Sequence, residues 1–219
     1  MTVQPDTSPA MSARSLIHGQ GHPSQVSRMR QRWRLETSGQ VFLVRRAVPA
    51  DLPAVMGAMV RSSALSRWQW RRTRGGGVPS MSETAQWLRQ PASLVVVAPS
   101  PSGARARGPR VVGIAGLANV DCAGGPAEHA AQAEVLVADP WQGLGVGRAL
   151  VAHLGAAAWL LGRRELMASP VADHETAEGL LAGLGQLQHV LHPHGSHARV
   201  RLGNHVVAGL GPLRIARLG

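Results

Sequence analysis

Apolar and polar positions alternate in a structured way from about residue 41 onward, whereas the first 40 residues show no sustained periodicity. Residues 1–40 are rich in Ser, Gln, Pro and Arg, so we predict a disordered basic N-terminal tail followed by one domain at 41–219. Short apolar runs in that domain predict strands, and apolar spacings of three and four predict helices. The expected strands are 41–44, 93–98, 110–118, 133–138, 165–169, 186–192 and 198–202, with 205–210 as a weaker candidate, and the expected helices are 49–62, 82–89, 145–161 and 175–184.

The stretch 133–150 carries the strongest signal for function. It reads as an apolar strand, a Pro turn, a Gly-rich loop and the first turn of a long helix. The loop, Gln142-Gly-Leu-Gly-Val-Gly147, has the pattern Q-x-x-G-x-G and places unpaired amides at the positive end of a helix, which suits phosphate. It is not a P-loop, because no Gly-Lys-Ser/Thr follows, and it departs from the dinucleotide-binding pattern. A plain strand-to-helix turn also fits these glycines.

Composition narrows the class of partner. The chain has 219 residues, of which 44% are hydrophobic, and all of its 23 basic residues are Arg. The formal net charge of +11 favours anionic partners, such as a CoA nucleotide, acidic proteins or nucleic acid. A single Cys excludes an internal disulfide framework and fits a cytoplasmic protein. We expect no membrane partner, because the N-terminus lacks a signal-peptide apolar region and the longest apolar run, 149–161, is too short for a bilayer.

The loop and the element order β-α-α-β-β-β-α-β-α-β-β across residues 41–210 resemble the GNAT superfamily of GCN5-related N-acetyltransferases. The segment Val41–Trp70, with Arg45, Arg46 and Asp51, is similar to the opening of its actinobacterial protein-lysine acetyltransferase subgroup. The resemblance implies an α/β (α+β) fold with a mixed, mostly antiparallel sheet of six to seven strands, splayed at the cofactor site and flanked by about four helices. It also implies acetyl-CoA as cosubstrate and direct transfer of an acetyl group to a primary amine on a protein lysine, an N-terminus or a small molecule.

The resemblance assigns cofactor contacts to the strand and the loop. Backbone groups of Val135, Leu136 and Val137 would hold the pantetheine arm, and the Leu136 amide would stabilise the oxyanion. The remaining loop candidates, which would wrap the pyrophosphate, are Gln142, Gly143, Leu144, Gly145, Val146, Gly147 and Arg148. Arg148 also fits a solvated surface residue. His174 occupies the position where many members carry an Asn that seats the CoA arm, and a helix-capping role for it stays open.

Acyl transfer to an amine needs a proton acceptor, because a lysine amine has a pKa of about 10.4 and arrives charged. Glu134 is the candidate base. In the protein-lysine acetyltransferase subgroup the Glu falls at Gln132, which shares a strand face with Glu134 by its period of two. Catalysis through water, and a structural carboxylate at Glu134, stay open. The usual Tyr acid aligns with Leu181 and the chain has no Tyr, while Ser169 stands where some members place a Glu base.

Two rival functions remain at this stage. The missing Tyr and displaced Glu also fit a catalytically degenerate GNAT-like module that binds CoA for regulation or protein interaction. The segment Arg61–Arg74 holds five Arg with Trp68 and Trp70, a mixture that can bind single-stranded nucleic acid. In the GNAT resemblance it is the acceptor-side helix and loop, suited to an acidic substrate, and we favour over both a solvated face with Trp packed into the core. We rank a nucleic-acid-binding protein last. The sequence does not define the molecule that carries the acceptor amine, although the positive net charge is compatible with an acidic one. A homodimer also stays open.

Two further features invite chemistry that we do not assign. The histidines at positions 189, 192, 194 and 197 would scatter over both faces of a strand pair, so we predict no metal site. Cys122 lies in a Gly/Pro loop, and direct transfer needs no acyl-enzyme nucleophile, so we interpret it as incidental.

Overall fold

The computed structural model describes residues 32–37, 40–71, 79–99, 110–120, 129–168, 174–192 and 195–208. These residues form one eight-stranded sheet in the order β1-β2-β3-β4-β5-β6-β8-β7. Every neighbouring pair is antiparallel except β5 and β6, which run parallel. The predicted mixed, mostly antiparallel fold is therefore confirmed, with one strand more than the upper expectation.

The strands are β1 (Trp33–Thr37), β2 (Gln40–Arg46), β3 (Leu94–Ala98), β4 (Arg110–Asn119), β5 (Ala130–Val137), β6 (Glu165–Ala168), β7 (Leu187–His192) and β8 (Gly195–Arg201). The helices are α2 (Leu52–Val60), α3 (Ala64–Arg71), α4 (Met81–Leu88), α5 (Val146–Leu160), α6 (His174–Ala182) and α7 (His205–Ala208), with short 3₁₀ turns η1 (Pro49–Asp51) and η4 (Asp139–Trp141).

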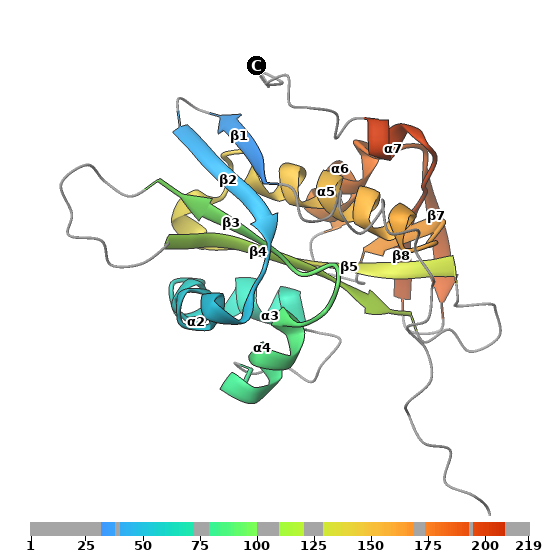
Figure 1. Ribbon diagram of the computed structural model, residues 1–219. Coiled ribbons are helices and arrows are strands. Elements are labelled where there is room, and N and C mark those ends of the chain that lie inside the picture. Colours follow the sequence, from blue (N-terminus) through green and yellow to red (C-terminus); the bar gives the residue numbers. More distant parts are fainter. Residues whose placement is uncertain are drawn as a thin grey trace, which may run out of the picture.

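Two layers of helix enclose the sheet (Figure 1), with α2, α3 and α4 on one face and α5, α6 and α7 on the other. The core on the α2 side includes Val55, Trp87 and Ile114. The core on the α5 side includes Phe42 and Leu150. Since strand side chains alternate between faces, each apolar strand contributes side chains to the cores on both faces of the sheet.

Three elements depart from the sequence-based expectation. Strand β1 lies inside the stretch 1–40 expected to be a tail, because its Trp33 is buried and packs edge-on against His153 with ring centroids 4.5 Å apart. Residues 1–31 lie outside the described residues. Helix α3 forms in the basic segment Arg61–Arg74, where the apolar pattern predicted no helix, and α7 forms where a weak strand was expected at 205–210.

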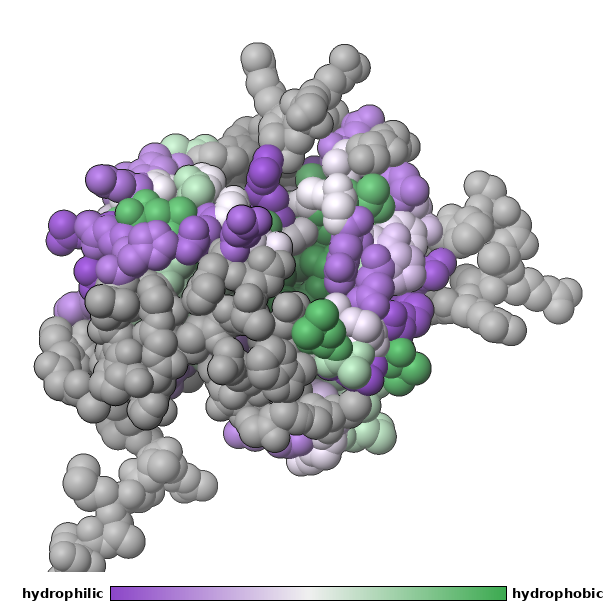
Figure 2. All heavy atoms as spheres, turned by 180° about the vertical axis from the view of Figure 1, so that it is seen from behind, coloured by the Kyte–Doolittle hydropathy of each residue, from purple (hydrophilic) through white to green (hydrophobic). Residues whose placement is uncertain are grey.

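The surface of the described residues is mostly polar. Figure 2, seen from behind, shows hydrophilic side chains over much of the described surface with apolar residues scattered between them. The exposed large apolar side chains among the described residues are Val48, Val60, Leu65 and Met81. None of the helices in the described part of the chain has the length and apolar character needed to cross a bilayer.

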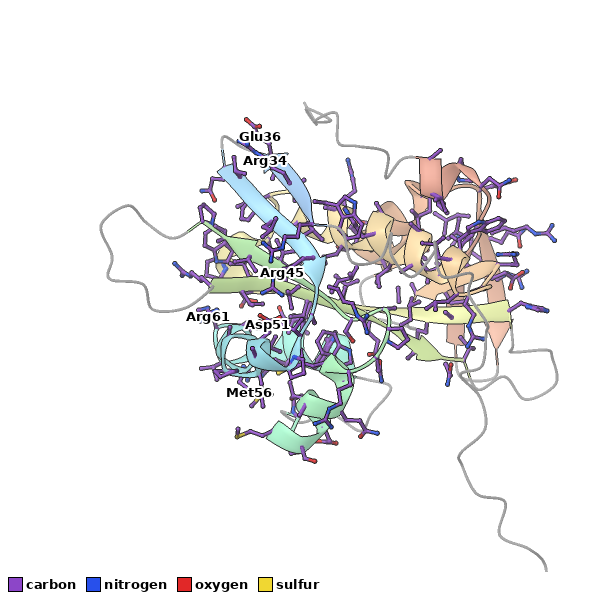
Figure 3. The ribbon with its side chains drawn as sticks, in the orientation of Figure 1. Arg34, Glu36, Arg45, Asp51, Met56 and Arg61 are labelled. Atoms are coloured by element: carbon purple, nitrogen blue, oxygen red, sulfur yellow. The ribbon has the colours of Figure 1, made fainter. Side chains whose placement is uncertain are left out.

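A buried ion pair ties β2 to the start of the α2 layer. Arg45 and Asp51 face one another across this junction (Figure 3), with guanidinium-to-carboxylate distances of 2.6 and 2.7 Å. The Val48 N–H also donates to Asp51 Oδ2 at 2.9 Å. Burial alone would raise the pKa of Asp51, but the hydrogen bonds from Arg45 and Val48 and the charge of Arg45 hold that pKa below its ordinary value.

We expect Asp51→Asn to lower the free energy of unfolding by about 3 kcal/mol at pH 7, because it leaves Arg45 buried without its anion. The native pKa of Asp51 is depressed, so its contribution is present above about pH 4 and disappears as the pH falls through the native value. Urea unfolding between pH 7 and pH 3 should show a flatter acid limb in the variant. Glu165→Gln, which breaks the half-exposed pair with Arg199, is the control and should cost less than about 1 kcal/mol. Equal losses in the two variants would contradict the assignment.

A second buried titratable group, His153, lies in the middle of α5. Its Nδ1 is 2.7 Å from the Ala149 carbonyl oxygen, and its Nε2 is buried without a hydrogen-bond partner in the described structure. Burial lowers the pKa of His153, and the bond to Ala149 offsets this only in part. The ring is therefore neutral in the fold, with Nδ1 donating.

We expect His153→Leu to flatten the pH dependence of stability between pH 7 and pH 5. A depressed native pKa means that the parent is most stable above about pH 6.5 and loses up to about 1.4 kcal/mol per pH unit as the pH falls toward the native value. Denaturant unfolding at several pH values measures this slope. The matched control is His189→Leu, which removes a largely exposed ring and should keep the parent slope. A parent slope retained in His153→Leu would sink the assignment.

Candidate functional site

Strand β5 is paired on both sides along only half of its length. Its antiparallel register with β4 covers residues 131–137 without a shift. Its parallel pairing with β6 covers only Ala130–Ala133, where β6 ends. From Glu134 to Val137 one edge of β5 therefore has no strand partner among the described residues, and its backbone groups can bind an extended ligand.

The hydrogen-bond pattern between β4 and β5 determines which backbone groups of β5 point to that open edge. The Ala138 N–H donates to the Val112 carbonyl at 2.9 Å, directly across the pair. Alternate residues of an antiparallel ladder point their backbone groups at the same neighbour, so the groups of Leu136 point to β4. The groups of Val135 and Val137 then point to the open edge. The Leu136 amide, which was expected to stabilise an oxyanion, therefore faces β4, while the amides of Val135 and Val137 face the open edge.

The loop after β5 is anchored by apolar side chains. Trp141 packs edge-on against Phe42, with ring centroids 5.6 Å apart, and the Arg110 guanidinium lies 5.2 Å from the Trp141 ring. Leu144 is partly buried and Val146 is almost fully buried in the same cluster. Because these side chains point inward, the loop between them is held close to the sheet.

The glycines of the loop adopt a conformation that other residues avoid. Gly143 and Gly145 both have φ of 75°, and Gly145 is the residue that caps α5. The first helical bond there runs from the Ala149 N–H to the Gly145 carbonyl at 3.1 Å. The amides of Val146–Arg148 precede it and have no carbonyl within the helix to bind. This leaves a positive helix end with outward donors, beside Thr37, whose Oγ1 would lie 3.4 Å from a Cβ placed on Gly145.

Gln142 has a structural role that the sequence did not indicate. Its Nε2 donates to the Val137 carbonyl at 3.0 Å. The outward carbonyl of Val137 is therefore already bound, and Val135 is left as the residue with both backbone groups on the open edge. Gly147 faces Leu180, which would lie 3.5 Å from a Cβ at that position, an ordinary contact, and Arg148 is exposed.

Positive charge collects at the start of β4, next to the loop. The Arg61 guanidinium donates to the Val111 carbonyl at 2.7 Å. Burial, and then the nearby charge of Arg110, lower the pKa of Arg61 from its ordinary value. Arg110 was absent from the sequence-based candidates because no spacing rule connects it to Trp141.

The side chains of Gln132, Glu134 and Leu136 share the sheet face covered by α2, α3 and α4, as the strand period predicts. Glu134 is 3% exposed and lies opposite Gly116 on β4. The indole of Trp87 sits directly over Gly116, so close that the Cβ of any other residue there would be 2.6 Å from Trp87 Nε1. Trp87 therefore covers the residue paired with the candidate base, on the face opposite α5.

Helix α6 supplies no proton donor at the position expected to hold an acid. Leu181 is buried in the apolar cluster that also includes Leu184. Its neighbour Leu180 is the side chain that reaches the loop at Gly147. His174 begins α6, but its side chain lies outside the described residues, as does Ser169.

The features that suggested other chemistry are only partly described. Trp70 is buried and packs edge-on against Trp87, with ring centroids 6.3 Å apart, so this part of the Arg/Trp segment belongs to the core. Among the described residues no three His, Cys, Asp or Glu side chains gather in a metal-binding group. Cys122 and His194 lie outside the described residues, as do the side chains of His192 and His197, while His189 Nδ1 is 3.6 Å from Glu178 Oε1.

A half-paired strand, a Gly-rich loop and a helix N-terminus without a side-chain cap follow one another along residues 130–148. Residues 62–185, more than half of the chain, match the acetyltransferase (GNAT) family model. The chain belongs to the GNAT family. The resemblance predicted from the sequence is therefore confirmed, and acetyl-CoA-dependent acyl transfer is the chemistry of this family. No curated protein sequence matches the chain.

Solved structures agree on the fold. The GNAT domain of Streptomyces lividans PAT is 16% identical, with a TM-score of 0.62 over 83% of this chain and 99% of that domain. A putative acetyltransferase from Salmonella typhimurium, solved with acetyl-CoA, is 17% identical, with a TM-score of 0.52 over 75% and 95% of the two chains. A GCN5-related N-acetyltransferase from Kribbella flavida is 26% identical, with a TM-score of 0.50 over 74% and 98%.

Proposed function

We propose that this chain binds acetyl-CoA along the open edge of β5 and transfers the acetyl group directly to a primary amine. The observation that carries the proposal is the end of β6 pairing at Ala133, which leaves Val135 able to pair with an extended pantetheine arm. The arm would lead to the Gly143–Gly147 loop, where the amides at the start of α5 would hold the pyrophosphate. Arg110 and Arg148 would add positive charge around the nucleotide.

The chemistry divides between the edge and the face of β5. The Val135 amide would donate to the thioester oxygen as negative charge develops there. Glu134, on the α2–α4 face, would take a proton from the substrate ammonium, directly or through water, so that the free amine can attack the thioester carbon. The leaving thiolate needs no strong acid, because a thiol has a pKa of about 8.5, so the lack of Tyr is compatible with turnover. The net charge of +11 supports an acidic acceptor, including an acidic protein.

The second candidate is a CoA-binding module without turnover, and one observation favours it. Leu181, the position of the usual Tyr acid, is packed into the core rather than directed at the open edge. Such a module would keep the cofactor loop and would show binding without thiol release.

We expect Gly145→Glu to abolish acetyl-CoA binding, because it places bulk and negative charge where the pyrophosphate would lie. Calorimetry and the rise in melting temperature with acetyl-CoA measure the effect. Gly162→Glu is a matched control, since Gly162 has φ of 81° and Gly145 has φ of 75°, but Gly162 lies at the far end of α5 with open space around it. Both variants should lose about 1–2 kcal/mol of stability from the left-handed backbone, and only Gly145→Glu should lose binding. Absence of binding in the parent chain would reject the proposal.

For catalysis, we expect Glu134→Gln to slow CoA release from acetyl-CoA by about 100-fold at neutral pH in an amine-panel assay. The loss should shrink toward pH 10, where free amine is abundant and a base matters less. Glu178→Gln, which removes a partly exposed carboxylate from α6, should leave both rates unchanged. An equal loss at neutral and high pH would count against a base. No thiol release with any amine, in a parent that binds acetyl-CoA, would favour the module without turnover.

A further inference from the structure

The cofactor loop is joined to α3 by a hydrogen-bond network between segments that are far apart in the sequence. Asp139, the first residue of η4, accepts a bond from the Ser63 N–H at 2.8 Å and one from Ser66 Oγ at 2.9 Å. Ser63 lies 76 residues before Asp139 and immediately precedes α3. The carboxylate therefore binds the beginning of a helix that belongs to the opposite side of the site.

The contact with Asp139 supplies the negative charge that the first turn of α3 lacks in its own sequence. The first turn of α3 contains no acidic residue, and its local cap is the Ser63 hydroxyl, which accepts from the Ser66 N–H at 3.1 Å. A helix N-terminus is stabilised by negative charge and by acceptors for its unpaired amides. Asp139 provides both from a distant part of the chain, so the position of α3 depends on the position of η4.

Gln142 extends the network into the loop. Its Nε2 lies 3.2 Å from Ser66 Oγ, 3.2 Å from Asp139 Oδ1 and 3.0 Å from the Val137 carbonyl. An amide nitrogen carries two hydrogens, so the three acceptors must share them. A ligand that immobilises the backbone from Gln142 onward would also determine which of the three acceptors the Gln142 amide binds, and so whether it binds Ser66.

The other end of α3 reaches the acceptor side of the site. Trp70, near the C-terminal end of α3, packs edge-on against Trp87 of α4. Trp87 in turn covers Gly116, the residue opposite Glu134. One short helix thus touches the cofactor loop at its start and the wall beside the candidate base at its end.

We propose that Asp139 is a positioning residue that couples acetyl-CoA binding at the loop to the placement of α3 beside the acceptor amine. The proposal rests on the proposed function and adds a cofactor-dependent acceptor wall to it. Binding at the loop immobilises η4 and Gln142, and Asp139 transmits this to the first turn of α3. The acceptor side is then best formed when the cofactor is present.

Amide hydrogen exchange on the full chain, with and without saturating acetyl-CoA, tests the coupling. In the parent, acetyl-CoA should slow exchange in the segment Ser63–Arg67 by about 5-fold or more, the lower end of typical coupling between sites. The first turn of α4 is an internal control, because Ser80 and Glu83 cap it within its own helix. Its exchange should not respond to the cofactor.

Three variants distinguish coupling from general stabilisation. Asp139→Ala should retain acetyl-CoA binding by calorimetry but lose the protection of Ser63–Arg67. Asp139→Asn keeps a neutral acceptor and should restore part of it. Ser66→Ala leaves the Ser63 N–H bound to Asp139 and should reduce the protection without removing it. This variant replaces Asp139→Ala as the test if Asp139→Ala does not fold. Protection in Asp139→Ala equal to that of the parent would overturn the proposal, as would heat of binding without protection in the parent. No heat in the parent would overturn the proposed function as well.

Discussion

The early end of β6 is the constraint on which the site depends. Strand β5 pairs with β4 along nearly its whole length but with β6 only as far as Ala133, so half of one edge has no strand partner among the described residues. Buried backbone groups without partners cost free energy, and a strand edge of this kind is stable only if water or a ligand binds it. The loop and the start of α5 follow directly from the same strand, and they continue the line of backbone donors. The proposed cofactor site therefore depends mainly on backbone groups that the sheet leaves free of a strand partner.

The register of β5 separates two roles that the sequence places on the same residues: pairing with the cofactor through the backbone and acceptor chemistry through side chains. Backbone groups of odd-numbered residues point along the sheet to the open edge, while side chains of even-numbered residues point to the face under α2, α3 and α4. A cofactor and an acceptor can then approach the same stretch of strand from perpendicular directions. The alternation of side chains was predictable from the period of two, which placed Gln132 and Glu134 together. The phase of the backbone was not, because it depends on which residue of β4 lies opposite, as the Ala138–Val112 bond shows.

The elements that the sequence predicted well are those whose apolar pattern is local. Strands β3, β4 and β5, helix α5 and the Gly-rich loop all have such patterns, and Gly145 lies where its positive φ requires glycine. Strand β1 was missed because it is only five residues long and lies in a stretch without sustained periodicity; it is held by its pairing with β2 and by the contact of Trp33 with His153. Helix α3 was missed for a related reason: its sequence is polar, and the carboxylate at its start comes from Asp139.

Gln142 shows how one residue can constrain the position of the cofactor without contacting its reacting group. By binding the Val137 carbonyl it removes one of the few acceptors on the open edge, so an arm that pairs with β5 can find both a donor and an acceptor only at Val135. In the proposed complex, that would restrict the thioester to one register along the strand. The side chain before Val135 is Glu134, which is buried and lies opposite Gly116, the residue that Trp87 covers. In the proposed function, the residue whose backbone would hold the thioester and the residue whose side chain would receive the proton are thus adjacent in the chain.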